Sequence, residues 1–483
     1  MRSTDGIVSK AEALLGGGQV LAMDDVHAPR IDRLAGPWVP DTARPQAVVQ
    51  PATIEELQAL VRLAGETGYS LWCTPNGAGN GVTVGNLERP SLLLDLTRMD
   101  RIVEFDSDSA CALLEPGVSF NRLLAYIDDQ GLPFWIDCDL NGAHSICGSV
   151  CERAYGFTPY GDHLLMQCGM EIVLANGTVT RTGMGALPGN NTWQLFKYNF
   201  GPYLDGLFSR SDFAVVSKLG LWLMPAPPAY HPFMVTLPTE AAVGAAVELL
   251  RPFKIEMTVP NTVAISHLDT ERALLEKLTD TTASDVDELV QSGALGTWNL
   301  YGALYGLPDN VAFVWDRLGD ALGSLPGAKV FSAKDGRDDA AWTTRTKLMR
   351  GVPAYSDAAP ADEPMWFVAS AAMEEFDAKT MFSIVADELG KTDISFLAEF
   401  ALSWRTLFLR IEVPYGVADR TAKRDLVLVT MKRLTEAGYA VTHDSPDLTR
   451  AVAENQNGTG LAHLYDLIGQ ALDPAGTLGT RAR

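Results

Sequence analysis

The sequence predicts an α+β protein, with helices and strands in both halves of the chain. Three observations predict this class. Strand-like and helix-like patterns alternate in the first half, a proline-rich stretch interrupts the chain near residue 225, and longer helical patterns alternate with strands after it. At 483 residues, the chain has room for about three domains of roughly 150 residues, or for two larger ones.

The clearest local pattern is the succession of strand, helix, strand and loop between residues 47 and 81. Residues 47–50 are typical of a short strand, and Thr53 and Glu56 have the spacing of a capping box at the start of a helix. A second strand, residues 70–74, runs directly into a glycine-rich loop. The apolar residues of the helix recur at helical intervals: Ile54, Leu57, Leu60, Val61 and Ala64.

A proline-rich stretch marks a domain boundary. The apolar residues 221–224 are followed by Pro225-Ala226-Pro227-Pro228, and proline interrupts both helices and sheets. We therefore divide the chain into a first domain of residues 1–228 and a second domain of residues 229–438. Residues 439–483 look too short to fold alone, so we expect them to pack on one of the two domains.

The charge balance excludes several classes of partner. The chain has 38 basic and 60 acidic residues and a net charge of −22, which repels nucleic-acid phosphates and anionic membranes. No apolar run has the roughly 18 residues of a spanning helix, and the first residues lack the apolar core of a signal peptide, so we expect a cytoplasmic protein. The six cysteines form no zinc-type spacing, which predicts free thiols and no metal site.

The glycine-rich loop is the first candidate for binding. It comprises Asn76, Gly77, Ala78, Gly79, Asn80 and Gly81. Residues without a Cβ let backbone N–H groups approach a phosphate closely, which would suit a diphosphate; an ordinary tight turn is the alternative. The loop is not a Walker motif, because no Gly-Lys-Ser/Thr follows it, and no helix clearly begins there, as a Rossmann motif requires.

A second loop, residues 137–150, concentrates polar and small residues. Asp137, Asp139 and His144 lie in it, in the kind of turn-rich segment that often carries catalytic groups. A histidine can accept a proton near neutral pH. The alternative is a solvated loop with a surface histidine.

Several long motifs follow this second loop. They occupy residues 152–163 (ERAYGFTPYGDH), 167–177, 181–185, 191–197, 201–206 and 221–225. In these segments the chain resembles the vanillyl-alcohol oxidase and 4-cresol dehydrogenase flavoprotein family. The resemblance is strongest between residues 45 and 228, and weaker matches extend it over nearly the whole chain.

This resemblance implies a two-part FAD-binding domain of the PCMH type, with a core at about residues 45–228, and a mixed α/β cap domain above the flavin. It places the glycine-rich loop at the FAD diphosphate and returns residues 439–483 to the FAD domain. Further contacts with the cofactor are expected from Gly148, Ser149, Gly169, Glu171, Ile172 and Val173.

Two departures from the family bear on substrate and cofactor. Relatives that oxidise para-substituted phenols hold the phenolate between a loop tyrosine and a Tyr-Arg pair. Here Asn80, Ala440 and Val441 stand at those positions, which predicts that the substrate is not a simple para-alkylphenol. No histidine or tyrosine anchor follows Arg405, which predicts non-covalent FAD, with a cysteine link as the remaining alternative.

The resemblance also suggests catalytic residues. Asp139 followed by leucine imitates the acid that acts as a base near flavin N5 in relatives, although a count without gaps places Leu140 there. We therefore share the base role between Asp139 and His144. Arg405 and Arg410 on a cap strand are further candidates for contact with substrate or flavin, and salt bridges with Glu399 or Glu412 are equally open. We expect His163, which lies in one of the motifs, to satisfy backbone groups.

Together these features predict an FAD-dependent oxidoreductase that takes a hydride from an activated C–H bond, at an alcohol, benzylic or allylic carbon of a mostly apolar small molecule. Oxygen or an electron-accepting protein such as a cytochrome would reoxidise the flavin, and the family commonly forms homodimers or larger homo-oligomers. The alternative is a flavin-binding protein with a decayed redox site, serving partner binding or ligand sequestration. The pocket is expected to be largely apolar, lined by Trp135, Phe157, Phe408, Leu409 and Val441.

Overall fold

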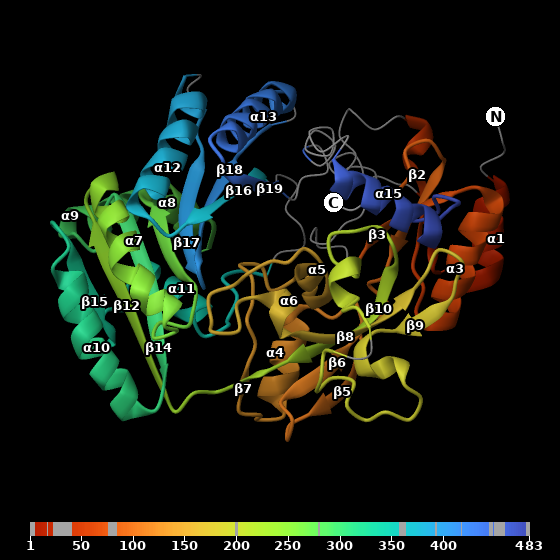
Figure 1. Cartoon of the computed structure of the whole chain (residues 1–483), viewed down its shortest axis with the longest axis horizontal. Helices are drawn as coiled ribbons and strands as arrows, with labels where there is room; N and C mark the ends of the chain where they lie inside the picture. Colours follow the sequence, from red (N-terminus) through yellow and green to blue (C-terminus); the bar gives the residue numbers. More distant parts are fainter. Residues whose placement is uncertain are drawn as a thin grey trace.

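The computed structural model consists of two domains that lie side by side, each built on β-sheet with helices packed against it (Figure 1). The glycine-rich loop, residues 76–81, lies outside the residues that the structure describes. The described residues are 5–16, 18–22, 41–75, 85–198, 201–278, 281–356, 364–391, 394–416, 418–443, 448 and 459–479.

The first domain contains two sheets. One has the strand order β1-β2-β4-β3, with β2, β4 and β3 parallel, and the other is antiparallel with the order β5-β6-β10-β8-β9. Their strands are β1 (Val20–Ala22), β2 (Pro45–Val49), β3 (Ser70–Thr74), β4 (Ser91–Asp95), β5 (Ile102–Asp106), β6 (Cys111–Leu114), β8 (Gln167–Val173), β9 (Val179–Arg181) and β10 (Val215–Trp222). The helices are α1 (Asp5–Leu15), α3 (Ile54–Thr67), α4 (Phe120–Asp129), α5 (Ile146–Cys151) and α6 (His163–Met166).

Helix α3 shows how local sequence signals become structure. Thr53 accepts a hydrogen bond from the backbone N–H of Glu56, and Gly68 ends the helix in the left-handed conformation with φ of 75°. The carboxylate of Glu56 reaches back to the N–H of Ala52, one residue before the cap. Of the predicted apolar face, Leu57, Leu60, Val61 and Ala64 are buried, and Ile54 is partly buried against the same core.

The second domain, the cap, is built on one antiparallel sheet of eight strands in the order β15-β12-β14-β13-β17-β18-β16-β19. Its strands are β12 (Ala229–Leu237), β13 (Val263–His267), β14 (Trp298–Gly306), β15 (Lys329–Ser332), β16 (Met365–Ala372), β17 (Leu397–Ser403), β18 (Thr406–Val413) and β19 (Ala440–His443). The helices are α7 (Glu240–Ile255), α8 (Leu268–Leu278), α9 (Ala283–Ser292), α10 (Pro308–Gly323), α11 (Ala340–Leu348), α12 (Glu375–Gly390) and α13 (Arg420–Glu436).

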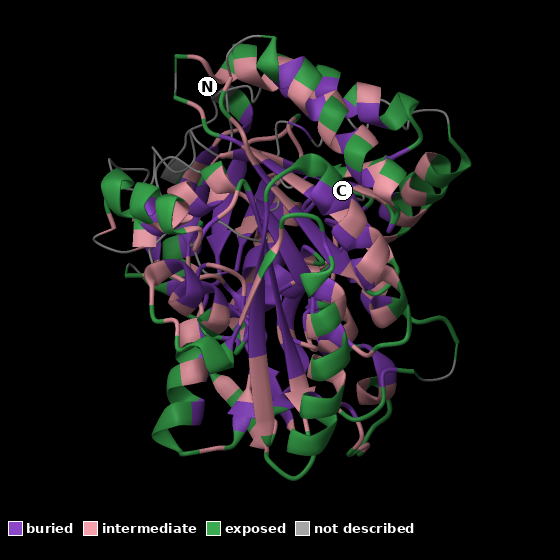
Figure 2. Ribbon diagram, turned by 90° about the vertical axis from the view of Figure 1, so that its left-hand side faces the viewer, coloured by how far each residue is buried: buried purple, intermediate pink, exposed green. Residues whose placement is uncertain are grey.

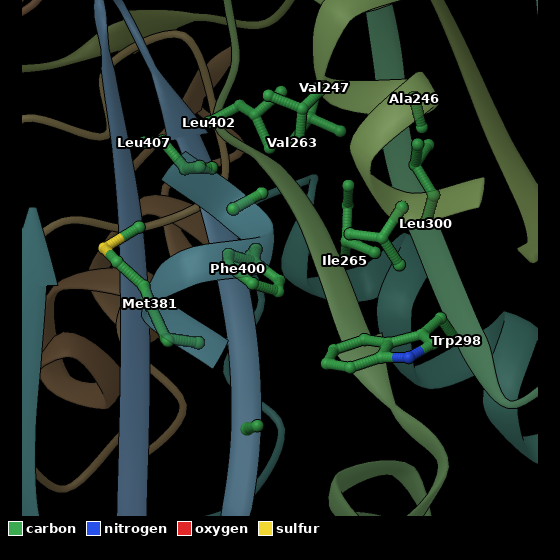
Figure 3. Packing of buried hydrophobic residues seen from close by; sticks show 14 of the residues in the cluster. Ala246, Val247, Val263, Ile265, Trp298, Leu300, Met381, Phe400, Leu402 and Leu407 are labelled. Atoms are coloured by element: carbon green, nitrogen blue, oxygen red, sulfur yellow. The ribbon is translucent and has the colours of Figure 1, made fainter. Parts of the chain in front are cut away.

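The cap sheet separates two cores, because side chains along a strand point alternately to its two faces. On one face, Phe400 and Trp298 pack with Met381 of α12 and Val247 of α7 (Figure 3). On the other face, strand residues pack with α8, α9, α11 and Phe157 of the first domain. Figure 2 shows the buried strands at the centre, with the exposed faces of the helices around them. This second face is the one that meets the first domain.

Contacts within the first domain hold the segment that leads into the cap and fix the C-terminal part of the chain. Strand β7 (Phe134–Trp135) pairs with β11 (Met224–Pro225) just before the cap begins. Helix α15 (Gly460–Leu472) packs on a core of the first domain, and the N–H of Leu71 donates to the carbonyl of Thr477 at 2.7 Å. Strand β19 still belongs to the cap sheet, so the cap extends past the expected end at residue 438. No helix in the described part of the chain is long and apolar enough to cross a membrane.

Candidate functional site

A hollow lies between the two sheets of the first domain. Its wall is mostly apolar, as is typical of sites that bind small molecules. Leu71 and Cys73 of β3, Cys147 and Cys151 of α5 and Val216 of β10 contribute to its wall. Because β3 leads directly into the glycine-rich loop, the hollow lies at the end of the strand after which that loop begins.

Helix α5 carries the cofactor candidates Gly148 and Ser149, and both are buried. The hydroxyl of Ser149 lies 2.8 Å from Nδ1 of His163, and Nε2 of His163 lies 2.8 Å from Oδ1 of Asp137. Asp137 also accepts a hydrogen bond from the N–H of Thr158 at 2.6 Å. His163 therefore bonds two side chains, where the sequence predicted backbone partners, and it holds the start of the polar loop against α5.

Strand β8 carries the other cofactor candidates. Gly169 has a φ of +82°, and a Cβ there would lie 2.3 Å from Nε1 of Trp193, so this position requires glycine to let the indole approach. Glu171 pairs with Arg181 at 2.9 Å and with Lys218 at 2.5 Å. Burial alone would raise the pKa of Glu171, but these two cations outweigh it and hold the pKa below its usual value. The remaining candidates are buried core residues: Ile172 and Val173.

The structure brings the two predicted base residues together. Nδ1 of His144 lies 2.7 Å from Oδ2 of Asp139, and the second oxygen of Asp139 accepts a hydrogen bond from the N–H of Asn141. The side chains of His144 and Asp139 are 19% and 22% exposed, so both are accessible from solvent. With the carboxylate as acceptor, Nδ1 carries the proton, which leaves the lone pair on Nε2 of His144.

A segment of the cap supports this polar loop. The N–H of Gly142 donates to the carbonyl of Tyr355 at 2.7 Å, and the N–H of Tyr355 donates to the carbonyl of Leu140 at 3.1 Å. The same segment begins at Gly351, where φ is +72° and a Cβ would lie 1.7 Å from the carbonyl oxygen of Ile136. The loop with Asp139 and His144 is therefore held at the junction of the two domains.

A second group of side chains meets at this junction. The ring of Tyr155 stacks on Phe408 of β18, with centroids 5.1 Å apart and planes at 15°. Burial raises the pKa of Tyr155 well above its usual value, and the nearby Arg410 opposes this only in part, so the hydroxyl keeps its proton at neutral pH. Nη2 of Arg410 bonds Glu412 at 2.7 Å, which confirms the salt-bridge alternative for this arginine.

Arg410 belongs to a network of charged side chains in the cap. In order, its members are Glu271, Arg345, Glu399, Arg410 and Glu412. Arg345 of α11 bonds Glu271 of α8 and, at 2.9 Å, Glu399 of β17. Glu399 lies directly opposite Arg410 across β17 and β18. Burial alone would lower the pKa of Arg345, but the two carboxylates outweigh it and raise the pKa, so Arg345 stays charged.

The other site residues predicted from the sequence do not lie together in the structure. Trp135 packs edge-on against Tyr230 at the start of the cap, and Phe157 is buried in the cap core beside α11. Arg405 is exposed in the turn between β17 and β18. Leu409 and Val441 belong to the core under the helices of the cap, on the face opposite to Phe408. Because side chains alternate along a strand, Leu409 and Val441 cannot line the same pocket wall as Phe408.

Sequence reasoning missed three residues at the junction: Tyr155, Tyr355 and Arg345. Tyr155 lies inside the motif of residues 152–163, next to Gly156. Its place in that motif could have marked it as a candidate site residue. Tyr355 and Arg345 have no local signal, because their partners are far away in the sequence.

Comparisons with known proteins agree with this architecture. Residues 45–183 match the family model described as FAD binding domain. The chain is 32% identical to the flavoprotein subunit of 4-cresol dehydrogenase [hydroxylating] from Pseudomonas putida, over 97% of this chain and 93% of the relative.

Two solved structures are similar over almost the full length. The structure of p-cresol methylhydroxylase with substrate bound has a TM-score of 0.88 and 31% identity, covering 98% of this chain and 95% of its own. The isoeugenol complex of 4-ethylphenol oxidase from Gulosibacter chungangensis has a TM-score of 0.90 and 26% identity, covering 100% and 98%. The chain therefore belongs to the vanillyl-alcohol oxidase and 4-cresol dehydrogenase family, with a PCMH-type FAD-binding domain and a cap, and is an FAD-dependent oxidoreductase.

Proposed function

We propose that this enzyme takes a hydride from an activated C–H bond of a mostly apolar aromatic molecule, at an alcohol, benzylic or allylic carbon. Two relatives are named for 4-cresol and 4-ethylphenol, which supports an aromatic substrate. The observation that carries the proposal is the bonded pair of Asp139 and His144, held between the FAD-binding domain and the cap.

The pair has the arrangement of a general base. Asp139 accepts the hydrogen bond of Nδ1 of His144, so Nε2 is the ring atom that would take a proton from a substrate hydroxyl or from water that adds to the oxidised carbon. The apolar rings of Tyr155 and Phe408 at the same junction exclude water from their contact. FAD, when bound, supplies the hydride acceptor; oxygen or an electron-accepting protein such as a cytochrome would take the electrons from it.

The expected departure from para-alkylphenols has support in the cap. Val441 packs toward the helix-covered core, and its neighbours Ala440 and Thr442 present no ionisable group on the other face of β19. The third position of the phenolate clamp, Asn80, lies outside the described residues. A substrate whose reaction does not depend on a phenolate therefore fits this site better than 4-cresol itself.

FAD is expected to dissociate from the denatured protein. The turn between β17 and β18 reads Trp404-Arg405, followed by Thr406, and offers no histidine or tyrosine to bond the flavin. Acid precipitation of the purified protein should leave the yellow colour in the supernatant. Colour retained in the pellet would contradict this expectation and direct attention to the thiols Cys73, Cys147 and Cys151, which line the hollow.

Anaerobic reduction tests the function directly. The purified enzyme with FAD bound should lose its absorbance near the visible flavin band when mixed with at least one member of a panel of benzylic and allylic alcohols and 4-alkylphenols. Faster bleaching by an O-methylated benzylic alcohol than by 4-cresol would support the substrate class. A protein that binds FAD but is bleached by no member of the panel would favour the alternative, a flavin-binding protein with a decayed redox site.

A further inference from the structure

Arg410 keeps one donor free at the junction of the two domains. Its Nη2 bonds Glu412, and its guanidinium lies 5.5 Å from the ring centroid of Trp366. Its Nε is buried and has no hydrogen-bond partner among the described residues. Buried N–H groups without a partner are rare in proteins, because nothing replaces the hydrogen bond that water would make. The geometry leaves this N–H for an acceptor that is not part of the described chain.

Tyr155 supplies a second donor beside it. Its ring stacks on Phe408, and Phe408 and Arg410 lie two residues apart on the same face of β18. The hydroxyl of Tyr155 is close enough to Arg410 for their charges to interact, and it stays protonated. One N–H and one O–H therefore lie on the same side of β18 beside an aromatic pair, an arrangement suited to an oxygen carried on an aromatic ring.

The charges around Arg410 decide which oxygen fits. The charge network contains three carboxylates and two guanidinium groups, so its sum is already negative. A carboxylate ligand that bonds Nε would have to share the guanidinium with Glu412, which already bonds Nη2. A second anion would also lie next to the carboxylate of Glu412, which raises its energy. An uncharged acceptor avoids both difficulties.

We propose that Arg410 and Tyr155 form a recognition site for an uncharged acceptor oxygen on the aromatic ring of the substrate: an aryl ether, a carbonyl or an un-ionised hydroxyl. The site selects against a carboxylate at the same ring position. This inference rests on the proposed function and deepens it, since it names the substituent that the substrate carries away from the reacting carbon.

The recognition site is connected to the polar loop through Tyr355. The backbone of Tyr355 bonds Leu140 and Gly142 on the two sides of Asn141, and its side chain is close enough to Arg410 to interact electrostatically. Lys277 lies 3.7 Å from the centroid of the Tyr355 ring and covers it from the side of α8. One residue of the cap thus bonds the loop of the base pair and lies near the recognition site.

Binding of two matched probes tests the proposal without turnover. The probes are 4-methoxybenzaldehyde, which carries an uncharged ether oxygen, and 4-carboxybenzaldehyde, which carries a carboxylate. Isothermal titration of the FAD-loaded protein should give the lower Kd for the methoxy probe.

Two variants remove the proposed donors one at a time. Arg410→Lys keeps the charge next to Glu412 and Glu399 but removes the Nε donor, and Tyr155→Phe keeps the stack but removes the hydroxyl. Each variant should raise the Kd of the methoxy probe by about three- to tenfold, the value of one hydrogen bond.

Control variants are Arg317→Lys on α10, whose guanidinium lies over Phe313 of the same helix, and Tyr126→Phe on α4, which is exposed. Neither should change either Kd. Unchanged affinity in both Arg410→Lys and Tyr155→Phe, tighter binding of the carboxylate probe, or no binding of either probe to the native enzyme would overturn the proposal. Flavin reduction is read separately: bleaching by the alcohol panel with unaltered probe affinities would sink this inference alone, whereas intact probe binding without any bleaching would sink the proposed function alone.

Discussion

Replacing Asp139 and His144 together, as Asp139→Asn with His144→Gln, is expected to slow flavin reduction by a factor of about 10² to 10⁴, the usual contribution of general acid–base catalysis. FAD should stay bound, because the two side chains bond each other and are not among the residues that line the hollow. Stopped-flow measurement of anaerobic flavin bleaching gives the rate, and the visible spectrum gives the FAD content.

The single variants assign the base. His144→Gln removes the proton acceptor, so it should be as slow as the double variant if His144 is the base. Asp139→Asn lets the imidazole change its tautomer and should cost less in that case. The reverse order would make Asp139 the base. His463→Gln, an exposed histidine on α15, is the matched control and should react at the native rate. A double variant that also reacts at the native rate would refute the assignment.

Local features of the sequence predicted local structure well. The cap and buried face of α3 follow from the residues between Thr53 and Ala64, because capping and helical periodicity depend on neighbours in the chain. Strand β19 was missed because it is only four residues long, and its identity depends on pairing with β16. Boundaries that are set by distant partners are not readable from the segment itself.

In the candidate site, too, some features were predictable from local sequence and others were not. Asp139 and His144 are five residues apart, and their loop could be recognised from composition; the structure places them in contact. The lining predicted for the pocket was less accurate, since Phe408 and its neighbour Leu409 point to opposite faces of β18. Which face meets the first domain depends on the packing of the whole cap sheet, and no residue within the strand specifies it.

The charge network was also beyond local reasoning. Arg345 lies 74 residues from Glu271 in the sequence, and nothing in either segment indicates its partner. Only the packing of α8 and α11 on the same face of the cap sheet brings the two together. Charged residues that appear as ordinary surface positions in a helical pattern are, in this case, among the most buried in the cap.

Arg345→Met is expected to have the largest effect on stability, lowering the free energy of unfolding by about 3–5 kcal/mol. The side chain is 3% exposed and that of Glu271 is 0% exposed, so removal of the guanidinium leaves the buried carboxylate of Glu271 without its cation and takes from Glu399 one of its two neighbouring cations. Unfolding by urea, followed by circular dichroism, measures the loss. The matched control is Arg424→Met on α13, whose partner Asp425 is 63% exposed; a surface pair contributes less than about 1 kcal/mol.

A triple variant separates loss of charge balance from loss of packing. In Arg345→Met with Glu271→Gln and Glu399→Gln, no uncompensated charge remains, and the amide oxygen of residue 271 can still accept the hydrogen bond that Tyr301 donates to Glu271 at 2.9 Å. The triple variant should therefore regain a large part of the lost stability. If it is as unstable as Arg345→Met alone, the guanidinium acts mainly through its packing over the ring of Tyr301, 4.8 Å away, and the electrostatic account is wrong.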